Sequence, residues 1–520
     1  MTPLPSLPDL PEWAHFVEAA QAAPTEPNDL HIISVAGLQV DTSGQKHSSQ
    51  LAASTEALLA ARRFTELRGQ LLSGEVANVT EDRAAWHTAL RTAAPQPEVA
   101  TERQRMLEFV RLADSERRWR NIVHIGIGGS DWGVRLVVKA FGYAGTWRDV
   151  RFVANIDGHA IEGGLEGLNP HDTLIVLASK SFTTAETLQN GKRAIEWLAA
   201  SGVANPFSQV VAVTAKPDVA KQWGVPEAHI FKLWDWVGGR FSLWSSVSLT
   251  TALAVGSEVV AGMLAGAQAM DTHFAEAPIA ENAPIQMAIS GIINRNVLGY
   301  ASLNIAPYDF RLAHFVAYIQ QLEMESLGKS VDLEGKPVGV ATGPAVWGIP
   351  GTDAQHTFFQ WLHQGSDGAP VDFIVCQQAD HGWVDHHKSL LANCLAQREA
   401  LLRGKTYETA LEECLAEGMP VDKAQWLAKH RVHEGGRPSS LIVLSKLTPY
   451  TLGALLALYE HKVFVQGVVW GINPFDQWGV EYGKVLAKGI FAELSGKPAS
   501  GADHDLSTAH WIDTFAGSWK

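Results

Sequence analysis

Short runs of apolar residues recur in two parts of the chain, and their pattern predicts buried strands. In the first half, segments long enough for a helix separate them, which is the spacing that parallel βαβ units require. These runs cover Asn121–Ile127, Arg151–Ile156, Thr173–Ala178 and Val210–Thr214. Two similar runs, Pro370–Val375 and Ser440–Ser445, lie further along the chain. The pattern therefore predicts an α/β fold with two sets of parallel strands.

Helical patterning occupies much of the remaining sequence. Leu51–Leu72 is rich in Ala, Leu and Glu at helical spacing, so residues 1–115 are predicted to be helical. Residues 250–330 also read as helical; there Arg311–Leu327 has one apolar side and Gly328 provides a stop. The polar stretch Ala499–Thr508 predicts an irregular surface segment. We therefore expect a helical segment packing on the larger domain (1–115), two α/β domains (116–265 and 266–498) and a C-terminal arm (499–520).

Composition and charge narrow the class of protein. The 520 residues are 46% hydrophobic and 18% charged, as in ordinary globular enzymes rather than disordered chains. A formal net charge of −14 argues against nucleic acid or an anionic membrane as the main partner. Cys376, Cys394 and Cys414 lack the spacing of a zinc site or a disulfide framework.

Two further features bear on location. The proline-rich N-terminus has neither the basic region nor the apolar core of a signal peptide. The apolar stretches around Leu452–Tyr459 and Val463–Ile472 are separated by Glu460, His461 and Lys462, so we expect neither to span a bilayer. These observations lead us to expect a soluble, cytoplasmic protein.

A glycine-containing loop follows the first predicted strand. Gly126–Asp131 includes Gly128, Gly129 and Ser130, whose backbone N–H groups can approach an anion at a helix N-terminus. A dinucleotide-binding fingerprint would need glycine where this chain has Asp131. Asp157, after the next strand, could imitate a ribose-binding acid. A nicotinamide-dependent dehydrogenase therefore stays open as the weaker alternative.

A second loop, Ser179–Thr187, carries five hydroxyl groups and Lys180 directly after a predicted strand. Hydroxyls, N–H groups and a lysine at a strand-to-helix junction favour a phosphate monoester. The structural alternative is a capping box, with Thr183 as N-cap and Glu186 at N3. Both interpretations can hold together, because a capping box uses only two of these side chains. The chain has no nucleoside triphosphate motif of the Gly-x-x-x-x-Gly-Lys-Ser/Thr type.

Two segments offer groups for proton transfer next to a carbonyl. Arg240 follows Gly238 and Gly239, and its permanent charge suits stabilisation of an oxyanion. Gln321 and Glu325 lie on one face of the predicted helix Arg311–Leu327, where apolar neighbours suit a partly desolvated base. The alternatives are an arginine that satisfies loop carbonyls and a solvated glutamate.

Histidines supply further candidates. His356 falls in the first turn of a predicted helix, where it can be either a structural hydrogen-bonding group or a catalyst. The segment Asp380–His387 holds two aspartates and three histidines, but it lacks metalloprotease spacing. We therefore expect no metal site in this segment.

The stretch Gly471–Lys484 combines a turn at Pro474 with polar residues at helical spacing. Gln477, Glu481 and Lys484 are predicted to line one face of a helix, since they are separated by four and three residues. The alternative interpretation is a solvated face with an ion pair between Glu481 and Lys484.

Taken together, these segments resemble the glucose-6-phosphate isomerase family. The matching motifs fall in the family's order over about residues 120–490 and include Ile125–Asp131, Ser179–Thr187, Val237–Ser245, Met324–Ser326, Gly351–His356 and Asp476–Lys484. The resemblance implies two sugar-isomerase (SIS) type domains with parallel sheets flanked by helices. It also implies a cofactor-free homodimer that interconverts glucose 6-phosphate and fructose 6-phosphate in glycolysis and gluconeogenesis.

The resemblance also implies residue roles. Glu325 is the expected base between C2 and C1, Arg240 stabilises the cis-enediolate, and His356, from the neighbouring subunit, assists ring opening with Lys484. The remaining matches are phosphate-loop positions and substrate-contacting glutamines, namely Gly129, Ser130, Ser179, Lys180, Ser181, Thr184, Gln321 and Gln477. Ser181 replaces a threonine, and Leu322–Glu323 replaces the commoner Gly–Asp before Met324. A dual glucose/mannose phosphate isomerase and a non-catalytic sugar-phosphate-binding protein remain alternatives.

Overall fold

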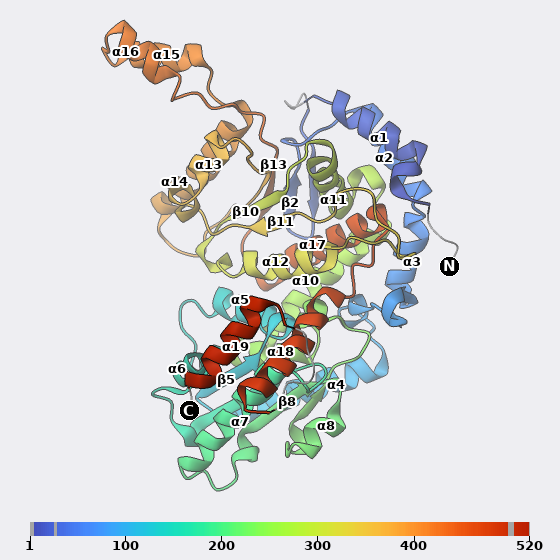
Figure 1. Cartoon of the computed structure of the whole chain (residues 1–520), viewed down its shortest axis with the longest axis vertical. Coiled ribbons are helices and arrows are strands. Elements are labelled where there is room, and N and C mark those ends of the chain that lie inside the picture. Colours follow the sequence, from blue (N-terminus) through green and yellow to red (C-terminus); the bar gives the residue numbers. More distant parts are fainter. Residues whose placement is uncertain (1–4, 25–28, 498–503, 519–520) are drawn as a thin grey trace. The chain divides into compact units, whose positions relative to one another are not determined.

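The computed structural model describes residues 5–24, 29–497 and 504–518. The chain forms two compact units, Met1–Pro474 and Phe475–Lys520. Two β-sheets flanked by helices organise the larger unit (Figure 1). The predicted α/β fold is confirmed. The domain boundaries near residues 115, 265 and 498 stay predictions.

The first sheet consists of five parallel strands in the order β6-β5-β7-β8-β9. Their bounds are β5 Asn121–Gly126, β6 Asp149–Val153, β7 Thr173–Ala178, β8 Val210–Thr214 and β9 Ile230–Lys232. The predictions for β7 and β8 are confirmed to the residue, and those for β5 and β6 to within a few residues. From β5 the chain moves outward to β6 and then returns past β5 to β7. The strand order therefore reverses between β5 and β7.

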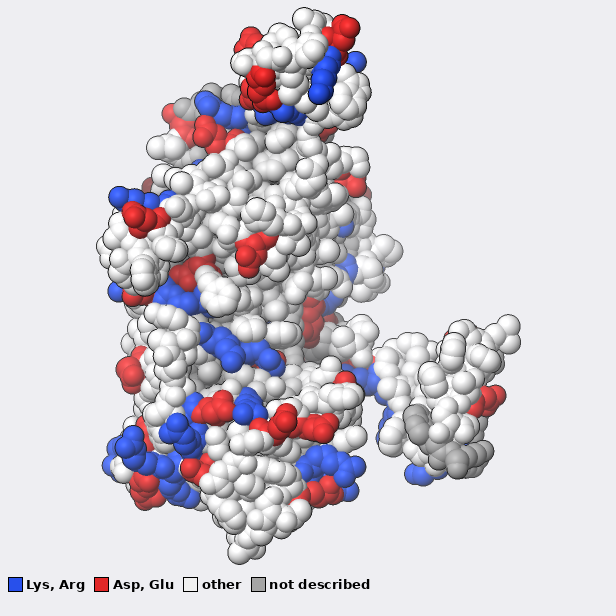
Figure 2. All heavy atoms as spheres, turned by 90° about the vertical axis from the view of Figure 1, so that its left-hand side faces the viewer, with Lys and Arg blue, Asp and Glu red and all other residues white. Residues whose placement is uncertain are grey.

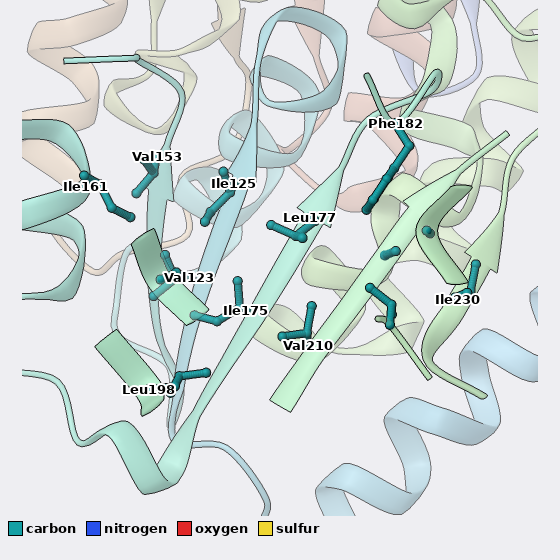
Figure 3. Packing of buried hydrophobic residues seen from close by; sticks show 14 of the residues in the cluster. Val123, Ile125, Val153, Ile161, Ile175, Leu177, Phe182, Leu198, Val210 and Ile230 are labelled. Atoms are coloured by element: carbon teal, nitrogen blue, oxygen red, sulfur yellow. The ribbon is translucent and has the colours of Figure 1, made fainter. Parts of the chain in front are cut away.

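Apolar side chains cover one face of this sheet. In β5 and β7 alternate residues point to the same side because side chains alternate along a strand. Helices α6 (Gly158–Leu165) and α7 (Ala185–Ala200) pack on this side. Figure 3 shows the resulting cluster, which includes Val123, Ile125, Ile161, Ile175, Leu177, Leu198 and Val210. This packing fixes the strands whose ends carry the candidate loops.

The second sheet is mixed, in the order β1-β2-β13-β12-β10-β11. Strands β10 (Ser302–Tyr308), β11 (Ala345–Trp347), β12 (Val371–Cys376) and β13 (Ser439–Leu444) are parallel. Strands β1 (Ile32–Val35) and β2 (Leu38–Asp41) form a hairpin, and β2 pairs antiparallel with β13. The prediction of parallel strands at β12 and β13 is confirmed, while that of a helical 250–330 is wrong at β10.

The N-terminal segment is only partly helical, because β1, β2 and a small hairpin of β3 (Val76–Asn78) with β4 (Arg83–Ala84) interrupt it. The helix predicted over Leu51–Leu72 is broken at Arg62–Arg63, where Arg63 adopts a φ of 54°. Arg62 is buried there and donates to the carbonyl oxygen of Val468. The helices of this segment are α1 Pro11–Ala22, α2 Ser49–Ala61, α3 Phe64–Ser73 and α4 Pro97–Ser115.

A long buried helix, α17 (Pro449–Trp470), packs against α10 (Ser257–Glu276), α11 (Ala283–Ile292) and α12 (Phe315–Leu327). Length and composition would allow α17 to cross a membrane, but its most apolar window is 100% buried inside the fold. The other helices of the larger unit are α5 Trp132–Phe141, α8 Pro217–Gln222, α9 Leu249–Val255, α13 Phe359–Gln364, α14 Val384–Arg403, α15 Tyr407–Ala416 and α16 Val421–Ala428. Helices α15 and α16 pair with each other and project from the rest of this unit (Figure 1).

The smaller unit contains α18 (Glu481–Leu494) and α19 (Leu506–Ser518), which pack together. The irregular segment predicted at Ala499–Thr508 is wrong from Leu506 onward, and residues 498–503 lie outside the described part of the chain. On the face of the larger unit in Figure 2, basic and acidic side chains are interspersed. Cys376, Cys394 and Cys414 are free and buried.

Candidate active site

The candidate loops meet at one edge of the first sheet. Strands β5 and β7 are parallel neighbours, so the loops that leave their carboxyl ends lie side by side. Ligands bind preferentially at this edge of an open α/β sheet, at the point where the strand order reverses. The glycine loop after β5 and the hydroxyl loop after β7 flank this point.

The glycine loop is shaped by close backbone approach. It forms a short 3-10 helix, η4 (Gly128–Ser130). Gly128 has a φ of +59°, which favours glycine. A Cβ at Gly129 would lie 2.0 Å from the carbonyl oxygen of Gly239. Only a residue without a side chain fits there, so this glycine brings the loop against the segment that carries Arg240.

Polar side chains fix the surroundings of this loop. Buried His124 contacts the carbonyl oxygen of Ser130 at 2.7 Å, and burial lowers the pKa of this histidine. Asp131, where a dinucleotide fingerprint needs glycine, pairs with Arg135 at 3.0 Å. Asp157 accepts a hydrogen bond from the N–H of His159 and caps α6. Both acids thus have local structural partners. The dehydrogenase interpretation would instead need glycine at the position of Asp131 and an Asp157 that binds a ribose.

The hydroxyl loop is internally bonded. Ser179 Oγ lies 3.0 Å from Thr184 Oγ1, and Ser181 Oγ lies 2.7 Å from Thr183 Oγ1. Helix α7 begins at Ala185 with Thr184 as N-cap, and no side chain caps it. The predicted capping box from Thr183 to Glu186 is therefore wrong. The helix N-terminus keeps backbone N–H groups that a bound anion can satisfy.

Lys180 joins the hydroxyl loop to the Arg240 segment. Its Nζ donates to the carbonyl oxygens of Asp235 and Val237, both at 2.8 Å. Burial lowers the pKa of Lys180 to about 8, and nearby Arg83 adds to this shift. An ammonium group has three donors, so two carbonyl contacts leave one hydrogen for an anion.

Arg240 and Glu325 form an ion pair at the centre of the candidate site. Arg240 lies on the 3-10 helix η8 (Gly239–Trp244), and its Nη1 is 3.0 Å from Oε1 of Glu325 on α12. The arginine side chain is 1% exposed and the glutamate 23%. The arginine also donates to the carbonyl oxygen of Pro474 at 2.7 Å. Its charge is therefore buried, while the carboxylate can still be reached from outside.

Gln321 connects this pair to the glycine loop. Its Nε2 donates to Oε2 of Glu325 at 3.0 Å, one helical turn away, as the predicted face of α12 requires. The same amide lies against Gly128, where a Cβ would come within 2.9 Å of it. The prediction that α12 ends at Gly328 is confirmed. Two oxygens of one carboxylate are thus held by two different side chains.

Sequence reasoning missed Ser326 as part of this site. Its Oγ accepts a hydrogen bond from Nε of Arg240 at 2.7 Å. The signal was present in the sequence, because Ser326 directly follows Glu325 and closes the motif Met324–Ser326. Consecutive residues of one helix thus contact Nε and Nη1 of the same guanidinium.

The candidate histidines lie on other elements. His356 ends the 3-10 helix η13 (Asp353–His356) and is exposed, whereas the sequence predicted a helical first turn. In the Asp380–His387 segment, Asp380 pairs with Arg311 and Lys446. No group of three or more His, Cys, Asp or Glu side chains within the described residues could hold a metal ion.

The predicted polar face of Gln477, Glu481 and Lys484 is wrong. Gln477 precedes a 3-10 helix, η14 (Trp478–Val480), and α18 begins only at Glu481. Lys484 Nζ forms an ion pair with Glu481 Oε1 at 2.7 Å. The ion-pair alternative therefore describes the local structure of the smaller unit.

Comparison with known proteins decides the family. A profile described as phosphoglucose isomerase matches residues 41–512. The chain belongs to the phosphoglucose isomerase family. This family membership confirms the resemblance drawn from the ordered motifs.

Several curated relatives of the phosphoglucose isomerase family align over most of the chain. A glucose-6-phosphate isomerase of Bordetella avium is 56% identical over 491 residues, covering 94% of each chain. One from Burkholderia orbicola is 44% identical over 467 residues, covering 87% of this chain and 85% of the relative.

A solved structure agrees with this family assignment. A crystal structure of a glucose-6-phosphate isomerase from Chlamydia trachomatis matches with a TM-score of 0.84 and 30% identity, over 99% of this chain and 100% of that chain. The arrangement of parallel sheets and flanking helices is therefore that of a phosphoglucose isomerase.

Proposed function

We propose that the protein interconverts glucose 6-phosphate and fructose 6-phosphate, as a glucose-6-phosphate isomerase of glycolysis and gluconeogenesis. The observation that carries this proposal is the Arg240–Glu325 pair, next to a hydroxyl loop that suits a phosphate monoester. The chain is 56% identical to a glucose-6-phosphate isomerase of Bordetella avium, which supports this choice of substrate. No cofactor enters the proposed reaction.

Glu325 is the base in this proposal. Its carboxylate takes the proton from C2 of the open-chain aldose and delivers it to C1, while the hydroxyl proton passes from O2 to O1, which gives the ketose. The intermediate cis-enediolate carries negative charge on oxygen, and a fixed cation near that oxygen lowers the barrier. Arg240 suits this role because a guanidinium stays charged at working pH. Ser326 and the Pro474 carbonyl hold it in place.

The hydroxyl loop supplies binding energy away from the reacting carbons. Ser179, Lys180, Ser181 and Thr184, with Gly129 and Ser130 nearby, are assigned to the phosphate and its surroundings. Binding energy at such a remote group positions C1 and C2 at the base. Gln321 is assigned to substrate contact as well as to holding Glu325.

Ring opening needs one group that gives a proton and one that takes it. We assign this step to His356 and Lys484, with Gln477 contacting substrate. We further propose a cytoplasmic homodimer in which the partner's copy of this histidine enters the site, consistent with the exposure of His356. A monomer mass in sedimentation equilibrium, at concentrations that support full activity, would contradict this assembly.

The function is tested by incubating the purified protein with fructose 6-phosphate in EDTA and following glucose 6-phosphate. We expect conversion to equilibrium without added metal or nicotinamide. Mannose 6-phosphate measured in the same samples separates a dual glucose/mannose isomerase from a glucose-specific one. Tight binding of fructose 6-phosphate without turnover would instead identify a sugar-phosphate-binding protein.

The position of Lys180 predicts an alkaline limit to activity. Burial lowers the pKa of this lysine to about 8, although nearby Asp235 and Glu81 raise it in part. The charge of Lys180 is therefore present below about pH 8 and lost above it. We expect kcat/KM for fructose 6-phosphate to fall above pH 8, approaching about tenfold per unit. Lys180→Arg keeps the charge and should extend the plateau upward. An unchanged profile in that variant would exclude Lys180 as the titrating group.

A further inference from the structure

Four consecutive polar residues occupy the middle of the buried helix α17. Tyr459, Glu460, His461 and Lys462 interrupt an otherwise apolar sequence, yet each is at most 2% exposed. Consecutive residues of an α-helix point about 100° apart, so together these side chains face all sides of the helix. Each has a polar partner on a different segment, and a buried charge needs such a partner.

Glu460 faces the helix that carries Arg240. Its Oε1 accepts a hydrogen bond from Nε1 of Trp244 at 2.8 Å, and Trp244 is the last residue of η8. Its Oε2 accepts one from buried Arg91, whose guanidinium also lies 4.7 Å from the ring centroid of Trp244. Glu460 and Arg91 thus hold the end of η8, four residues beyond Arg240.

Lys462 faces the helix that carries Glu325. Its Nζ donates to both carboxylate oxygens of Glu323 at 2.9 Å, and Glu323 lies on α12 two residues before Glu325. Both members of this pair are buried, at 2% and 0% exposure. The pair therefore fixes α12 against α17 on the side opposite the candidate site, since residues two apart on a helix face away from each other.

We propose that Glu460 and Lys462 are positioning residues that set the distance between Arg240 and Glu325. This inference rests on the proposed isomerase function. The two lie two residues apart on one rigid helix, and each holds one of the elements that supply the 3.0 Å ion pair. Buried ion pairs are often no more stabilising than apolar packing, so their contribution here is to geometry.

The test removes both charges of one of these pairs, while the neighbouring buried Asp372 keeps its hydrogen bond from Tyr459. Glu323→Gln with Lys462→Met is nearly isosteric and removes both charges, so the double variant should stay folded. We expect kcat for fructose 6-phosphate to fall about tenfold to a hundredfold, as for a misplaced catalytic group, with KM within about twofold. Thermal unfolding of the double variant is measured alongside, because the buried amide that Glu323→Gln introduces loses its partner and lowers the melting temperature, and kcat is compared where the variant stays folded.

Tyr459→Phe is the matched control on the same helix. It removes the 2.9 Å hydrogen bond to Asp372 on β12, an element that carries no proposed catalytic residue. Its kcat should be unchanged. A purely structural role for the polar residues predicts equal effects of both changes, or a kcat loss that only follows the unfolded fraction.

A second variant keeps the test decisive if the double variant does not fold. Trp244→Phe removes the bond to Glu460 from the η8 side, and we expect the same loss of kcat at constant KM. Normal kcat in either folded variant would overturn the positioning role. Should the unmodified protein fail to isomerise fructose 6-phosphate, the proposed function itself would be wrong, which is a distinguishable outcome.

Discussion

Glu325→Gln is expected to lower kcat by at least about 10²–10⁴-fold, the usual contribution of a general base. An amide has the same shape and still accepts a hydrogen bond from Arg240, but it cannot take the proton from C2. Among the described residues, the Glu325 carboxylate accepts hydrogen bonds from Arg240 and Gln321 and not from the hydroxyl loop, so KM should change little. The fold should be preserved, because Glu325 is partly exposed on α12.

The measurement combines steady-state kinetics with exchange of the C1 and C2 hydrogens in D₂O, followed by NMR. Exchange should be lost together with turnover, since both need the base. Glu334→Gln is the matched control: it removes one carboxylate from an exposed turn of the larger unit. Normal turnover or normal exchange in Glu325→Gln would contradict the assignment.

Strands buried on both faces were predictable from the sequence. Thr173–Ala178 and Val210–Thr214 are continuous apolar runs because central parallel strands are covered on both sides. Strand β10 escaped because Asn304 and Pro307 interrupt its apolar character, and proline argues against a central strand. The hairpin β1–β2 escaped because its outer strand is short and half exposed.

The members of the candidate site were predictable, but their contacts were not. Local motifs identified Arg240 and Glu325 because each lies in a distinctive short segment. Nothing local indicates that residues 85 positions apart form an ion pair, or that Gly129 touches Gly239. Such contacts depend on the packing of η4, η8 and α12. The same limit applies to α17, where Glu460–Lys462 looked like a break between apolar stretches until their distant partners were known.

Arg240→Ala is the variant that separates transition-state stabilisation from simple binding. If the guanidinium stabilises the enediolate, its loss should lower kcat by about 10²–10³-fold, as for removal of one oxyanion donor. KM should rise far less, because we propose that a different loop, Ser179–Thr187, binds the phosphate. Steady-state kinetics with fructose 6-phosphate gives both values. Removing exposed Arg111 on α4 by the same substitution controls for the loss of a positive charge and should leave both unchanged.

Arg240→Lys sharpens this argument. A lysine restores the charge but, as a point donor on a flexible stem, cannot reach Ser326, Glu325 and the Pro474 carbonyl together as the planar guanidinium does. We therefore expect kcat between those of the alanine variant and the unmodified protein. A rise in KM at constant kcat in both variants would make Arg240 a binding residue only. The charge that stabilises the enediolate would then have to come from another side chain.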